Sequence, residues 1–120
     1  MKEYQHLDKK SLKFIESKNP DWDELAKDCV CFANAHGGKI IIGVDDEEED
    51  PKPNQTVDDT LPGLFQQQIT NRTINVGLNC IKATHQNGGE FLEVTVHPSK
   101  ESIASTTNGR YYIRVNDECK

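Results

Sequence analysis

Residues 45–50, Asp-Asp-Glu-Glu-Glu-Asp, form an unbroken acidic run directly after an apolar segment. Carboxylate oxygens suit hard cations such as Mg²⁺ and Ca²⁺, so Asp45 and Asp46 are the candidate metal ligands. The run lacks the alternating spacing and the glycine of an EF-hand loop. We therefore expect a solvated acidic loop over residues 45–56, no metal site and no resident cofactor.

Basic and aromatic residues gather near both ends of the chain, where they have the chemistry of a nucleic-acid-binding surface. Lysine neutralises phosphates and tyrosine stacks on bases. If the first and last strands are neighbours, these side chains form one patch. The alternative is a solvated lysine face with a tyrosine in the core. The candidate residues are Lys9, Lys10, Lys13, Lys18, Arg110, Tyr112 and Arg114.

The four cysteines do not have the spacing of a zinc site. Cys29 and Cys31 form a C-x-C pair rather than C-x-x-C, and no second close pair follows them. Cys29 lies in step with apolar residues at helical spacing, which predicts a core position. Without a secretory signal, we expect all four cysteines to be free thiols in a reducing compartment.

Length and charge limit the classes of protein that fit. The 120 residues suit one domain, which we take as 1–120. The net charge is −6, and residues 21–50 alone carry ten acidic residues and two lysines, a net charge of −8. A dedicated DNA-binding protein usually has a basic footprint, so this balance argues against tight nonspecific binding of nucleic acid.

The sequence gives no sign of a membrane segment or an export signal. It has no run of about 18 apolar residues, and its N-terminus lacks an apolar signal region. We therefore expect a cytoplasmic protein without membrane partners.

Apolar spacing predicts the elements that position these groups. Alternation predicts strands over 11–18, 73–84, 91–97 and 111–115, and a continuous apolar run predicts a buried strand over 39–44. Helical spacing predicts helices from about 21 to 36, capped by Asn19 or Asp21, and from 56 to 71. A hairpin turn is expected at 85–89. This order predicts an α+β domain with two helices on one side of a mixed sheet.

Residues 30–46 resemble the Schlafen AlbA-like domain, a family of DNA-binding modules. The matching motifs are Phe32-Ala-Asn-Ala35, Gly37-Gly38 and Gly43-Val-Asp-Asp46, and Tyr112-Ile-Arg-Val115 fits the family's closing strand. Many members are the N-terminal part of longer proteins of the transcriptional-regulator type. The resemblance therefore allows the chain to be a domain excised from a longer protein.

Some animal Schlafen proteins cut RNA with three acidic residues, because clustered carboxylates hold the metal that activates water. Aligning residues 12–16 with the family's strand motif puts Asp8 at the first acid, Lys13 at the second and Asp45 or Asp46 at the third. A lysine there removes a ligand and repels the cation. Glu16 is a possible substitute for the second acid.

These patterns lead to three hypotheses. The first is a noncatalytic nucleic-acid-binding regulatory module that binds DNA or RNA. The second is a protein-interaction or homodimerisation domain. The third is an Mg²⁺-dependent endoribonuclease with an incomplete acidic site formed by Asp8, Glu16 and Asp45.

Overall fold

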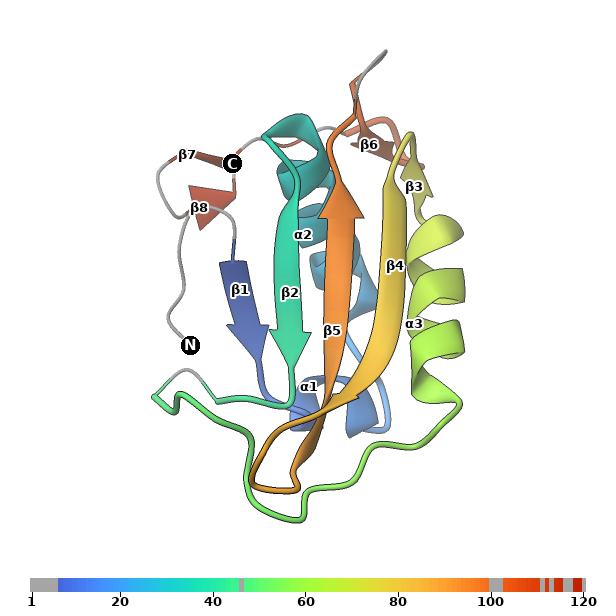
Figure 1. Cartoon of the computed structure of the whole chain (residues 1–120). Coiled ribbons are helices and arrows are strands. Elements are labelled where there is room, and N and C mark those ends of the chain that lie inside the picture. Colours follow the sequence, from blue (N-terminus) through green and yellow to red (C-terminus); the bar gives the residue numbers. More distant parts are fainter. Residues whose placement is uncertain are drawn as a thin grey trace.

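A four-stranded mixed sheet forms the centre of the fold, with the strand order β1-β2-β5-β4 (Figure 1). The strands are β1 (Leu7–Lys10), β2 (Gly38–Ile42), β4 (Gly77–Thr84) and β5 (Glu90–His97). β1 runs parallel to β2, and the other two pairings are antiparallel. This computed structural model describes residues 7–45, 47–99, 103–110, 112, 114–115 and 118–119.

The two longer helices, α2 (Trp22–Asn34) and α3 (Leu61–Thr70), cover the same face of the sheet (Figure 1). A single-turn helix, α1 (Lys13–Glu16), lies at the end of the sheet where β1 and β2 finish. This arrangement confirms the predicted α+β fold with two helices on one side of a mixed sheet. None of the described helices has the length and apolar run that crossing a bilayer requires.

The core lies between the sheet and these two helices. Strand alternation turns Leu92, Val94 and Val96 of β5 toward the helices, where all three are buried. Trp22 of α2 contacts Phe65 of α3 edge to face, with ring centroids 5.8 Å apart. Burial of these apolar surfaces is the main driving force for the fold.

Both ends of α2 follow from local residue chemistry. Asp21 caps the helix, because its carboxylate accepts the backbone N–H of Glu24 at 3.1 Å. Gly37 follows the helix with φ +78°, and a side chain there would put Cβ 2.7 Å from the carbonyl oxygen of Val96. Glycine is therefore required at the turn that leads from α2 into β2.

The acidic loop over residues 45–56 crosses to α3 and is fixed at several points. Most of its described residues are exposed, as predicted, but Pro51 is fully buried. Gln55 donates its side-chain amide to the carbonyls of Gly43 and Glu90, at 2.9 and 2.8 Å. The loop is therefore solvated along its length but held against the sheet.

The predicted strand over 11–18 is wrong. The first strand is β1, which precedes that segment, and residues 13–16 form α1. Leu12 and Ile15 are both buried and lie three residues apart, a spacing that suits a helical turn. The alternation of β1 escapes an apolar search because Asp8 and Lys10 point toward the helix layer.

The C-terminal part of the chain also differs from the prediction. Two short pairs of strands stand apart from the central sheet: β3 (Thr73–Ile74) with β6 (Ser105–Thr106), and β7 (Arg114–Val115) with β8 (Glu118–Cys119). β3 and β4 replace the single strand predicted over 73–84, because Asn75 interrupts it with φ +64°. The first and last strands are not hydrogen-bonded neighbours.

Candidate functional site

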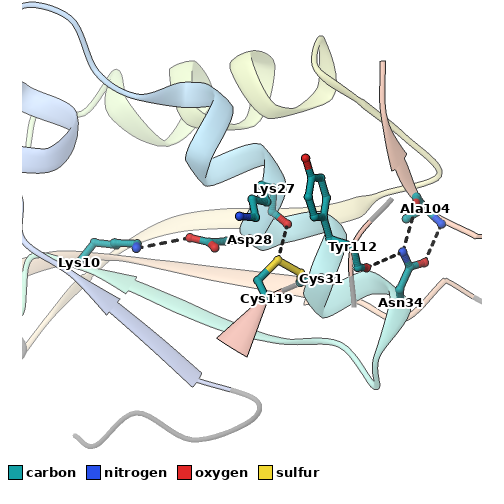
Figure 2. The surroundings of a disulfide bond; sticks show 8 residues. All are labelled: Lys10, Lys27, Asp28, Cys31, Asn34, Ala104, Tyr112 and Cys119. Atoms are coloured by element: carbon teal, nitrogen blue, oxygen red, sulfur yellow. Dashed lines mark hydrogen bonds and ion pairs between the residues drawn. A yellow bond between two sulfur atoms is a disulfide. The ribbon is translucent and has the colours of Figure 1, made fainter. Parts of the chain in front are cut away.

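A cluster of three charged side chains lies between β1 and α2. Lys10 Nζ is 3.4 Å from a carboxylate oxygen of Asp8 and 3.4 Å from one of Asp28, and Figure 2 shows the second contact. The side chain of Asp28 is 9% exposed, and that of Asp8 is 14% exposed. The ammonium group also lies 5.2 Å from the ring centre of Phe14.

The ion pair does not fully compensate the burial of Asp28. Burial raises the pKa of Asp28 to about 6; Lys10 opposes this rise, and Asp8 and Glu24 add to it. The buried Oδ2 atom of Asp28 forms the ion pair with Lys10 Nζ at 3.4 Å but accepts no hydrogen bond of good geometry. For Lys10, burial alone would lower the pKa, but Asp28 and Asp8 together outweigh burial and raise it. Lys10 is thus held as a cation inside a cluster with two carboxylates.

Sequence reasoning missed Asp28, although the chain carries a signal for it. Asp28 lies three residues after Leu25 and four before Phe32, so it falls on the buried face of α2. An acidic residue in the middle of an apolar helix face needs a buried partner. That requirement points to an inward-facing lysine on an adjacent element.

A second polar site, which we call the α1 end, surrounds α1. Its cavity of about 300 Å³ is open to solvent and is lined by residues of α1, the end of β2 and the acidic loop. The charged lining consists of two lysines and four carboxylates: Lys13, Lys52, Glu16, Asp45, Glu48 and Asp50. We include the exposed Lys18, which follows α1, in the α1 end.

The three candidate catalytic acids do not come together. Glu16 and Asp45 both line the cavity of the α1 end, whereas Asp8 pairs with Lys10 in the other cluster. Among the residues that the structure describes, no group of three or more histidines, cysteines or acids is arranged to hold a metal ion. Asp46 lies outside the described residues.

The alignment that placed Lys13 at the family's second acid also needs correction. That alignment assumed a strand over the segment that includes Lys13, but Lys13 begins α1. Asp8 is the acidic residue on β1. Lys13 therefore does not occupy a strand position beside Asp8.

The structure separates the four candidate lysines into two kinds. Lys9 is buried and donates to the backbone carbonyl of Glu48 at 2.7 Å, and Lys10 belongs to the cluster with Asp28. Lys13 and Lys18 are exposed and form no ion pair within the described part of the chain. The lysines of the predicted patch thus divide, and the exposed ones, Lys13 and Lys18, lie at the α1 end.

The candidates near the C-terminus lie in different surroundings. Arg110 is exposed, whereas Tyr112 is half-buried and packs against the core. Lys27 Nζ lies 5.2 Å from the ring centre of Tyr112. Arg114 lies on β7, and its side chain is outside the described part. The contacts of Tyr112 match the alternative in which the tyrosine belongs to the core.

Asn34, part of the Phe-Ala-Asn-Ala motif, connects α2 to the C-terminal region (Figure 2). Its amide donates to the carbonyls of Ala104 and Tyr112 at 2.9 and 3.0 Å, and its oxygen accepts the N–H of Ala104 at 2.7 Å. A side chain with both donors and an acceptor is needed for these three bonds. The motif asparagine therefore has a structural role in this chain.

The expectation of four free thiols is wrong. Cys31 of α2 and Cys119 of β8 form a disulfide with a Cα–Cα distance of 5.8 Å, typical for such a bond (Figure 2). Cys29 and Cys80 are buried free thiols, and Cys29 lies in the core as predicted. The pair escaped prediction because 88 residues separate its members.

Comparisons with known proteins place this fold in a family. The model of the family described as "Schlafen, AlbA_2" matches residues 3–120. The crystal structure of the DIP2311 protein from Corynebacterium diphtheriae has a similar fold, with a TM-score of 0.64 and 20% sequence identity. The similarity covers 97% of this chain and 22% of the DIP2311 chain. No curated protein matches. Since the family model spans nearly every residue, the chain belongs to the Schlafen AlbA_2 family.

Proposed function

We propose that this chain is a nucleic-acid-binding regulatory module that binds phosphates through the lysines of the α1 end. The observation that carries the proposal is that Lys13, Lys18 and Lys52 are exposed and form no ion pair within the described residues. Such lysines can neutralise phosphates without breaking an internal contact. The chain belongs to the Schlafen AlbA_2 family, and the DNA-binding role that the sequence resemblance implies for this family supports the proposal.

The carboxylates of the α1 end set a limit on how tightly it binds. The cavity lining carries two lysines against four carboxylates, so its own charge repels phosphate. Phosphates therefore contact the lysines at the rim, where solvent and salt screen the acids. We expect weak binding that is sensitive to salt and has little sequence preference, because phosphate contacts carry no base information.

The test is fluorescence anisotropy with labelled single-stranded DNA, duplex DNA and a structured RNA, each in Mg²⁺ and in EDTA. We expect binding that weakens with salt and leaves the nucleic acid intact. Lys13→Gln and Lys18→Gln should weaken binding to all three probes. Lys39→Gln is the matched control, since Lys39 is exposed but paired with Glu93 at 3.1 Å. Absence of binding to every probe at low salt would refute the proposal.

The same experiment separates binding from cleavage. Glu16 and Asp45 share the cavity with two lysines, whose ammonium groups disfavour a divalent cation there. This favours a noncatalytic role. Mg²⁺-dependent cleavage that is lost in Asp45→Ala would instead assign the chain as an endoribonuclease.

Self-association is the second candidate function, and one observation favours it. β4 is an eight-residue strand at the edge of the sheet, and Ile81 on it is 55% exposed. An edge strand offers unpaired backbone groups to another chain. Sedimentation velocity over a range of concentrations tests this, with Ile81→Lys expected to abolish any dimer. A monomer at all concentrations would exclude self-association.

A further inference from the structure

Cys31 and Cys119 form a disulfide with each other, and the other two cysteines are free thiols. Cys31 lies on α2 with 0% of its surface exposed, whereas Cys119 on β8 is half-buried. Cys29 is only two residues from Cys31, but residues at that spacing point to different sides of a helix. Cys29 therefore packs in the core together with Cys80, away from the disulfide.

Contacts among the described residues place the C-terminal strands β7 and β8 against α2. Asn34 binds the carbonyl of Tyr112, which precedes β7, and Lys27 lies over the Tyr112 ring. On β8, Cys119 Sγ lies 3.5 Å from the carbonyl oxygen of Lys27, a weak contact (Figure 2). The disulfide adds a covalent connection between α2 and β8.

We propose that the Cys31–Cys119 pair is a reversible redox latch that fastens the C-terminal hairpin β7–β8 to α2. The oxidant is a low-molecular-weight disulfide such as glutathione disulfide. In sum, two protein thiols and one small disulfide give the protein disulfide and two small thiols. Two electrons and two protons pass from the protein to the small disulfide.

Burial assigns a different part of the exchange to each cysteine. The thiolate of Cys119 attacks the small disulfide, which releases one small thiol and leaves a mixed disulfide on Cys119. The thiolate of Cys31 then attacks Cys119 Sγ and expels the second small thiol. In the disulfide-bonded fold Cys31 is enclosed and Cys119 is half-buried, so a small thiol or disulfide reaches the sulfur of Cys119 more readily than that of Cys31. Cys119 is therefore the exchanging thiol and Cys31 the resolving thiol.

The other two cysteines do not compete for the oxidant. Burial raises the pKa of Cys80 to about 12 and raises that of Cys29 further. The thiolate is the reacting form of cysteine, so both side chains remain protonated and inert near neutral pH. They serve as an internal reference for thiol counting.

The first test counts thiols by alkylation in denaturant, followed by intact-mass measurement. After equilibration with glutathione disulfide, the wild-type chain should have two alkylated cysteines, and after reduction four. Cys31→Ser should trap one glutathione on Cys119, whereas Cys119→Ser should trap none. Four free thiols in the oxidised wild type, or equal trapping by both variants, would overturn the proposal.

The second test needs no variant, so it stands even if a substitution prevents folding. Hydrogen exchange is followed in oxidised and reduced wild-type protein, in peptides that contain β7 and β8. We expect exchange there to rise at least about tenfold on reduction, while peptides from β2 and β5 keep their rates. Unchanged exchange in the hairpin would overturn the latch. No readout involves nucleic acid, so the result does not depend on the proposed function.

Discussion

Lys10 and Lys13 lie three residues apart, but the fold uses their charges in opposite ways. Lys10 is partly buried where β1 faces α2 and pairs with two carboxylates, while Lys13 is exposed at the α1 end. Asn34 resembles Lys10, because it also satisfies buried partners. We refer to Lys10, Asp28 and Asn34 as the α2 flank. The comparison shows that the element carrying a lysine, and not its distance along the chain, decides whether its charge can reach a ligand.

The largest effect is expected from Lys10→Met in the α2 flank. The substitution keeps the aliphatic stem but leaves Asp8 and Asp28 enclosed without their cation. Breaking a buried ion pair in this way should lower the free energy of unfolding by about 4 kcal/mol. Urea denaturation at pH 7 measures the loss. Lys13→Met is the matched control and should change the free energy of unfolding by less than about 0.5 kcal/mol. Equal effects of the two substitutions would contradict the claim that the lysine of the α2 flank stabilises the fold and the lysine of the α1 end does not.

A slightly smaller effect is expected from the titration of Asp28. Its pKa of about 6 in the folded protein exceeds its ordinary value of 3.8. Between these pH values the folded state keeps a proton that the unfolded chain has released, so the free energy of unfolding falls as pH rises from about 4 to 6. The fall should total roughly 3 kcal/mol. Urea denaturation across this pH range should show a smaller fall in the free energy of unfolding for Asp28→Asn than for the wild type. The same pH profile in both proteins would contradict the raised pKa of Asp28.

Next in size is Asn34→Ala. It removes two donated hydrogen bonds and one accepted bond to Ala104 and Tyr112. Leaving these backbone groups without partners should cost about 2 kcal/mol. Thermal and urea denaturation measure the loss, with Asn19→Ala, at an exposed position before α2, as the control. If Asn34→Ala is as stable as the control, the motif asparagine has no structural role here.

Much of the fold could be predicted because its strands and helices bury regular apolar stripes. β5 shows this best, since the alternation that predicts a strand over 91–97 places Leu92, Val94 and Val96 on one face, and all three are buried in the core. The capping carboxylate of Asp21 and the turn before β5 were also predictable, because both depend on residues close in sequence. The family motif in residues 30–46 is likewise a pattern of residues close together in the sequence.

The features that the sequence did not predict depend on contacts between residues far apart along the chain. β1 could not be found by apolar alternation, since Lys10 points inward toward an acid 18 residues later. The disulfide joins residues 88 positions apart. The candidate site was predicted only in part: Glu16 and Asp45 do share a cavity, but Asp8 and the lysines of β1 have internal partners. Which polar side chains are satisfied internally is a property of the tertiary fold.

The most direct test of the central claim is the salt dependence of nucleic-acid binding. The affinity for single-stranded DNA is measured over a range of NaCl concentrations for the wild type, Lys39→Gln and the double variant Lys13→Gln/Lys18→Gln. The logarithm of the association constant falls linearly with the logarithm of the salt concentration, and each lost phosphate contact makes this fall less steep by about 0.7. We predict that the double variant loses about 1.4 from the slope and that Lys39→Gln keeps the wild-type slope. A wild-type slope in the double variant would show that the α1 end does not contact phosphate.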